Sequence, residues 1–231
     1  MADFMNEQEQ VELIKNLWNR YGNWVLGLFV IIAFSLSGYQ YWEHRQAQNL
    51  NQASEMYLSL VNSANQKDWV NLSAQAQYLM ANNAHSAYAG LGALVLASAD
   101  VNQNKLPEAS AALQWILNNQ TNQDIKDVAR VRLARINLSQ GEPLDAIKIL
   151  TPVSQTYFIS SEMVLGDAYV LLGQNDQATQ AYQAALGRLQ QLNKMGGDEA
   201  ESRADQADQA DQDPGLLNLI QMKLASLPSK S

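Results

Sequence analysis

The chain has 231 residues, a formal net charge of −8, 47% hydrophobic residues and no cysteine. This length suits one medium-sized domain with an additional segment, and the lack of cysteine excludes disulfides, thiolate catalysis and cysteine-based metal sites. Six of the eight excess negative charges lie between Gly196 and Gly215. The rest of the chain is nearly neutral, so it carries no basic footprint for nucleic acid.

Residues 21–43 are predicted to form a transmembrane anchor, preceded by a short tail over residues 1–20. The 22 uncharged residues that begin at Tyr21 would span roughly 30 Å as a helix, the thickness of the hydrocarbon core of a bilayer. The alternatives are a cleaved signal peptide or the core helix of a soluble protein. An acidic start, and an apolar run that continues past Ser35 and Ser37, favour the uncleaved anchor. The aromatic residues expected at the two membrane interfaces are Trp18, Tyr21, Trp24, Tyr39, Tyr41 and Trp42.

The orientation of the anchor follows from the positive charges on its two sides. Lys15 and Arg20 precede the apolar stretch, whereas only Arg45 follows it closely. The positive-inside rule therefore places the short tail in the cytoplasm and the large domain on the other side of the membrane.

The large domain is predicted to be all-α, with helical periodicity throughout and no strand-like alternation. Residues 44–83 indicate a juxtamembrane helical hairpin, and residues 84–195 contain repeats. Two stretches, "LARINLSQGEPLDAIKIL" from Leu133 and "LGDAYVLLGQNDQATQAY" from Leu165, align without gaps at a period of 32 residues. The matching positions are Leu133, Ala134, Gly141, Ala146 and Leu150, and then Leu165, Gly166, Gly173, Ala178 and Tyr182.

This pattern resembles the tetratricopeptide repeat, in which small residues let two antiparallel helices approach and Gly ends the first helix. A weaker upstream copy has Asn104 at the Gly position, where Asn also tolerates the left-handed conformation. Pro152 is expected to stop a helix near Leu150. The expected fold is a solenoid of about three to four hairpins.

Two segments follow the repeats. Residues 196–215, with their threefold "ADQ", are predicted to be an acidic disordered insertion. An alternative interpretation is a charged segment that attracts a basic partner. Residues 216–231 are predicted to supply a helix that caps the exposed end of the stack, and a short tail.

The order of these pieces, from "NEQEQVELIKNLWNRYG" through "GYQYW" and the repeats to "IQMKL", resembles the YfgM-like family of ancillary subunits of the bacterial SecYEG protein-export channel. The acidic insertion departs from that pattern. The resemblance implies an inner-membrane protein with a periplasmic repeat domain. It also implies as partners the export channel, membrane lipid and a membrane-anchored chaperone related to peptidyl-prolyl isomerases.

No constellation of residues in the sequence favours catalysis or a cofactor. The two histidines, His44 and His85, lack partner ligands at helical spacing. "GLG" at residues 90–92 lacks a preceding strand and a third Gly, so small residues at a helix contact explain it better than a dinucleotide loop. We therefore expect neither an enzyme nor a metal site nor a bound cofactor.

A concave groove lined by the first helices of the repeats is the expected binding surface. The residues expected to face it are Leu94, Ser98, Val101, Val131, Arg135, Leu138, Met163, Asp167 and Val170. The basic stretch "KDVARVRLAR" has a simpler reading as a solvated face, in which Asp127 pairs with Arg130.

Two functions remain open for such a protein. The first is an anchored scaffold that helps pass translocated chains from the export channel to periplasmic chaperones. The second is an assembly factor for cell-envelope or division proteins, with the same groove and other partners. The identity of the clients, the oligomeric state and the part of the chain that contacts the channel are not fixed by the sequence.

Overall fold

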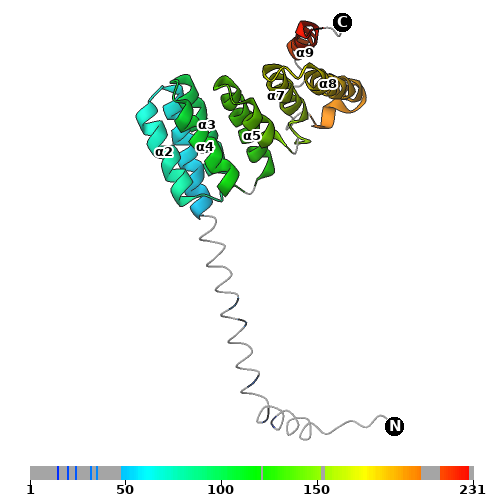
Figure 1. Cartoon of the computed structure of the whole chain (residues 1–231). Coiled ribbons are helices and arrows are strands. Elements are labelled where there is room, and N and C mark those ends of the chain that lie inside the picture. Colours follow the sequence, from blue (N-terminus) through cyan, green and yellow to red (C-terminus); the bar gives the residue numbers. More distant parts are fainter. Residues whose placement is uncertain are drawn as a thin grey trace, which may run out of the picture. The chain divides into compact units, whose positions relative to one another are not determined.

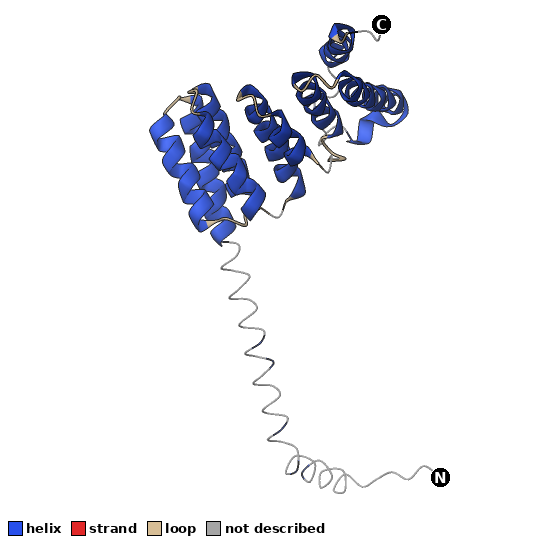
Figure 2. Ribbon diagram, viewed as in Figure 1, coloured by secondary structure: helices blue, strands red, loops and turns tan. Residues whose placement is uncertain are grey.

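The computed structural model of the chain describes residues 48–120, 122–151, 154–203 and 214–228, and five single residues before them. Two compact units divide the chain, residues 1–52 and residues 53–231. All regular structure in the described residues is helical (Figure 2), as the sequence predicts. None of the helices in these ranges has both the length and the apolar character needed to cross a membrane. The predicted anchor, residues 21–43, lies outside the described residues apart from three single positions.

Most successive helices of the second unit are joined by short connections (Figure 1). A helix that includes residues 48–65 comes first. The helices after it are α2 (Trp69–Asn82), α3 (Ala87–Asn102), α4 (Leu106–Asn119), α5 (Gln123–Ser139), α6 (Pro143–Leu150), α7 (Phe158–Leu171), α8 (Asn175–Arg203) and α9 (Pro214–Ser226). They pair into four hairpins, in which α2, α4, α6 and α8 are the second helices.

All four hairpins turn in the same way, at Lys67, Asn104, Gly141 and Gly173. These residues have φ angles of 57°, 59°, 78° and 71°, in the left-handed region. In each case the next residue donates its N–H to the carbonyl five positions earlier, at 2.8–2.9 Å, which closes the helix in a Schellman motif. The expectation for Asn104 is confirmed. The turn at Lys67 shows that the hairpin predicted for residues 44–83 ends its first helix in the same way as the three repeats.

Packing inside each hairpin depends on one small and one large residue, seven positions before and nine positions after the turn residue. The pairs are Ala97 with Leu113, Ala134 with Leu150, Gly166 with Tyr182, and Leu60 with Ala76. All of these residues are buried. The first hairpin reverses the order, since the large residue stands on its first helix. Leu133, Leu165, Ala146 and Ala178, at the other repeat positions, are also buried.

The third hairpin has a short second helix. The helix α6 has 8 residues, whereas α2 and α4 have 14 each, and it ends at Leu150 as the position of Pro152 predicts. The connection to α7 is fastened to α5, because the Ser154 hydroxyl donates to the Asp127 carboxylate at 2.5 Å and accepts from the Tyr157 N–H at 3.2 Å.

The C-terminal part differs from the expected boundaries. The helix α8 continues to Arg203, into the stretch from residue 196 that the sequence indicates as disordered. Its composition explains the extension, because Glu, Ala and Arg after Gly197 are good helix formers. Residues 204–213 lie outside the described residues. The helix α9 then packs against α8, with Ile220 fully buried in a cluster that includes Leu189.

Candidate partner-binding groove

The nine residues expected to face a groove lie in three different environments. Leu94, Val131 and Met163 are buried, Leu138 and Asp167 are half-buried, and Ser98, Val101, Arg135 and Val170 are exposed. Four of the nine are therefore exposed. Leu94 and Ser98 do lie together, in the wall of a pocket.

This pocket has a volume of about 390 Å³. It lies between the helix of residues 48–65, α2, α3 and α5. Its lining is Tyr57, Ala64, Trp69, Leu72, Leu91, Leu94, Val95, Ser98, Ala99, Asn102 and Arg132. The volume falls in the range of ligand pockets, which are mostly apolar with a few convergent polar groups. We call it the Arg132 pocket.

Polar groups stand along one side of the Arg132 pocket. Arg132 of α5 reaches across to α3, where its Nη1 donates to the Leu94 carbonyl at 3.2 Å. Ser98 and Asn102 follow Leu94 at successive turns of α3 and are both exposed. The lining also includes two aromatic residues, Trp69 and Tyr57, and the ring centroid of Tyr57 lies 5.8 Å from that of Tyr88.

The charge of Arg132 is unbalanced within the described residues. No carboxylate there lies within salt-bridge distance of Arg132 or of the neighbouring Arg135. Desolvation lowers the pKa of Arg132 and the charge of Arg135 lowers it further, while Tyr157 acts in the opposite direction. An arginine keeps its proton at neutral pH in any case. The site is therefore locally positive.

Sequence reasoning missed Arg132, Trp69 and Tyr57. It placed the inner face of each first helix at positions two before, two after and five after the signature Leu. On α3 the pocket instead follows Leu91, Leu94, Val95, Ser98, Ala99 and Asn102, a stripe at spacings of three and four. Arg132 stands directly before Leu133, at the position that Val95 holds on α3. The alignment of Arg132 with Val95 was the sequence signal that could have identified Arg132 as a pocket residue.

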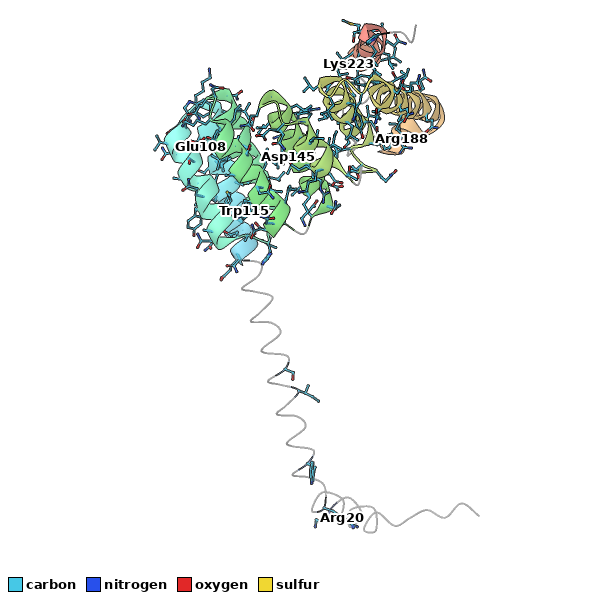
Figure 3. The ribbon with its side chains drawn as sticks, in the orientation of Figure 1. Arg20, Glu108, Trp115, Asp145, Arg188 and Lys223 are labelled. Atoms are coloured by element: carbon cyan, nitrogen blue, oxygen red, sulfur yellow. The ribbon has the colours of Figure 1, made fainter. Side chains whose placement is uncertain are left out.

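At the other end of the stack, the expected groove residues of α7 are tied to α9. Lys223 of α9 (Figure 3) forms an ion pair with Asp167, and the Tyr182 hydroxyl donates to the same carboxylate at 2.6 Å. Burial raises the pKa of Tyr182, and the hydrogen bond to Asp167 and its negative charge raise it further. Met163 belongs to the apolar cluster around Ile220. Asp167 and Met163 are thus engaged by other parts of the chain, whereas Val170 is exposed.

The basic stretch on α5 is not simply a solvated face. Asp127 does pair with Arg130, as the spacing predicts, but Asp127 is only 3% exposed. It also accepts from the Gln123 side-chain amide at 2.8 Å and from the Ser154 hydroxyl. The role of this cluster is to hold the connection between α6 and α7.

The "GLG" stretch is explained by close packing. A Cβ at Gly90 would lie 2.9 Å from both the Gln120 side chain and Ile125, and one at Gly92 would lie 3.1 Å from Leu79. Gln120 is itself buried, and its amide donates to the Ala84 carbonyl at 2.7 Å.

The remaining expected site residues are two histidines and the interfacial aromatics. His85 is exposed, and no group of three or more His, Cys, Asp or Glu in the described part of the chain could hold a metal ion. Trp24 is 82% exposed. His44, Trp18, Tyr21, Tyr39, Tyr41 and Trp42 lie outside the described residues.

Comparison with known proteins agrees with this architecture. A family model described as "Tetratricopeptide repeat-like domain" matches residues 15–196. Proteins named "Ancillary SecYEG translocon subunit" from Neisseria gonorrhoeae and Haemophilus influenzae are 26% and 25% identical to this chain. The matches cover 77% and 75% of this chain and 86% and 85% of the relatives. One of the same name from Escherichia coli is 29% identical over 66% of this chain and 73% of its own length.

Proposed function

The chain belongs to the tetratricopeptide repeat-like domain family, and on that premise we propose that it is a non-enzymatic scaffold at the bacterial protein-export channel. The similarity to ancillary SecYEG translocon subunits over most of their length carries the proposal. The resemblance to the YfgM-like family stated from the sequence is confirmed by these relatives.

The proposed topology follows from the charge and hydropathy of the N-terminal part. Residues 1–20 are a cytoplasmic tail, residues 21–43 cross the inner membrane once, and the helical hairpins lie in the periplasm. Two positive charges before the apolar stretch against one close after it support this orientation. The threefold "ADQ" of residues 204–212 contains no apolar residue larger than Ala, and in this proposal it does not join the packed core.

The proposed action is the handover of translocated chains to periplasmic chaperones, among them an anchored one related to peptidyl-prolyl isomerases. An anchor confines the binding surface to a thin layer above the membrane. The resulting effective concentration, on the order of millimolar, makes weak and quickly reversible contacts sufficient. Exposed groove residues such as Ser98, Val101 and Arg135 are available for such contacts.

The test is purification of the intact, tagged protein from its own membranes in mild detergent, with bound proteins identified by mass spectrometry. A control lacks residues 1–43. We expect the export channel and a periplasmic chaperone with the intact protein, and loss of the channel with the control. Recovery of envelope-assembly or division proteins without the channel would refute the proposal and favour the alternative assembly factor.

A variant tests whether the exposed groove residues contribute. Arg135→Glu reverses a charge on the exposed side of α5, and we expect it to weaken recovery of partners without unfolding the hairpins. Arg188→Glu on α8 (Figure 3) is the matched control, since Arg188 is also an exposed helix residue and lies outside the groove. Equal recovery with both variants would remove Arg135 from the binding surface.

A further inference from the structure

We propose that the Arg132 pocket binds an extended peptide segment in which a bulky apolar side chain adjoins an acidic side chain. This inference rests on the proposed function, since it names the kind of client segment that the scaffold takes.

The apolar half of the pocket fits one large side chain. Its lining includes the buried residues Leu72 and Leu94 and the aromatic residues Trp69 and Tyr57. Ala64 and Ala99 are small, so the pocket has depth where larger residues would fill it. An aromatic or branched apolar side chain placed there is removed from water against these groups, which favours binding.

The charge of the site selects an acidic neighbour. Arg132 donates a hydrogen bond to the Leu94 carbonyl, and the fork geometry of its guanidinium leaves further N–H donors. The charges of Arg132 and Arg135 repel each other, and no carboxylate in the described ranges pairs with either residue. A ligand carboxylate would relieve that repulsion and bind in a charge-assisted, bidentate manner. A lysine in its place would meet a like charge.

The polar edge suits an extended main chain. Leu94, Ser98 and Asn102 stand one turn apart along α3, so the exposed hydroxyl and amide continue the line that begins at Arg132. Their side chains can donate to and accept from successive peptide groups. A peptide lying along α3 would therefore place its acidic side chain at Arg132 and its apolar side chain against Trp69.

The experiment titrates the intact protein in detergent with a labelled peptide and follows fluorescence anisotropy. The probe has one phenylalanine followed by one aspartate in a glycine–serine background, with a blocked C-terminus so that the side chain is its sole carboxylate. Two matched probes replace the aspartate by lysine or the phenylalanine by alanine. We expect each replacement to weaken binding about tenfold or more, as loss of a charge-assisted contact or of a buried side chain implies.

Two variants locate the binding site. Arg132→Glu reverses the charge, and Ser98→Trp fills the pocket from an exposed position that the packed core does not use. We expect both to weaken binding of the phenylalanine–aspartate probe at least about tenfold, while Arg188→Glu leaves it unchanged. Circular dichroism melting of each variant checks that the hairpins remain folded. Binding that is equal for all three probes, or unaffected by both pocket variants, would overturn the proposal.

The membrane purification separates this inference from the proposed function. If the probe binds in the pocket and the export channel is absent from the purified complex, the pocket is established and the scaffold function fails. If the channel is recovered but the probe ignores the pocket variants, the scaffold function stands and the pocket proposal fails.

Discussion

The aromatic ring of Tyr182 on α8 occupies the space that a side chain at Gly166 of α7 would need. A Cβ at Gly166 would lie 2.3 Å from Tyr182 Cε1 and 2.6 Å from Cδ1. The two residues therefore form one packing unit, in which the absence of a side chain on one helix makes room for a large ring on the other. The same positions in the third hairpin hold Ala134 and Leu150.

The variant Gly166→Ala should be destabilised by about 1–3 kcal/mol, the usual cost of overpacking a well-filled core. Urea denaturation followed by circular dichroism measures the effect. Gly187→Ala on α8 is the control, because nothing lies within 4 Å of its added Cβ and removal of a glycine from a helix stabilises it by about 0.5–1 kcal/mol.

A double variant separates packing from helix propensity. If Tyr182 causes the cost, Gly166→Ala combined with Tyr182→Leu, the arrangement of the third hairpin, should lose less stability than the two single changes together. Strict additivity would contradict the packing explanation.

Loss of the buried carboxylate on α5 should loosen the connection before α7. Asp127→Ala leaves the Gln123 amide, the Arg130 guanidinium and the Ser154 hydroxyl without their acceptor, so we expect a loss of about 2 kcal/mol in unfolding free energy. Asp124→Ala is the control, since Asp124 is exposed in the first turn of the same helix and should cost about 0.5 kcal/mol. Equal effects in urea denaturation would count against the bridging role.

Asp100 should make the stability depend on pH. It is buried near the C-terminal end of α3, where the helix dipole disfavours a negative charge. Desolvation raises its pKa above the usual 3.8, Lys105 lowers it in part, and Glu108 adds to the rise. The folded state therefore holds this proton more tightly than the unfolded state. Its contribution to stability declines as the pH rises from 3.8 through the raised value.

The variant Asp100→Asn tests this linkage. Asn137 occupies the equivalent position before the turn of the third hairpin, so the amide is already compatible with the fold. Denaturation midpoints should show a gain over the parent protein near neutral pH, where the parent carries the buried charge. The gain should shrink as the pH falls below the ordinary value of 3.8. A gain that does not vary with pH would assign the effect to something other than ionisation.

The turn at Lys67 is a place where the chain can be stabilised. Its φ of 57° costs a residue with a Cβ atom roughly 1–2 kcal/mol. The cost is smaller for Asn and smallest for Gly. Lys67→Gly should therefore raise the thermal midpoint more than Asn104→Gly does, whereas Gly141→Ala, with φ of 78°, should lower it. A larger gain at Asn104 than at Lys67 would contradict this ranking.

The recurrence of Gly141, Gly173 and Asn104 was sufficient to predict the all-helical repeat, because these residue types tolerate the left-handed turn. The first hairpin was harder to recognise as a repeat, since it has Lys67 at the turn and reverses the small and large residues to Leu60 and Ala76. Packing constrains the combined volume of such a pair more than its order, and a search for the usual order overlooks the reversal.

The candidate site was predictable only in part, for a geometric reason. Leu94 and Ser98 were predicted correctly as lining residues, because the predicted inner face of α3 differs only slightly from the face that lines the pocket. Arg132 was missed because a shift of one residue rotates a side chain by about 100° around a helix. The ion pair between Lys223 and Asp167 joins residues far apart in the sequence, and no local pattern specifies such a contact.

The short α6 has a consequence for how the stack comes apart. In an array of repeats each unit is stabilised mainly by its contacts with its neighbours, so cooperative unfolding depends on the interface between each pair of repeats. The third hairpin contributes to this interface a second helix, α6, of only 8 residues, whereas the preceding second helices have 14. An irregular connection follows α6. We expect the last hairpin with α9 to open separately from the first two hairpins, and native-state hydrogen exchange would show this as weaker protection of its amides.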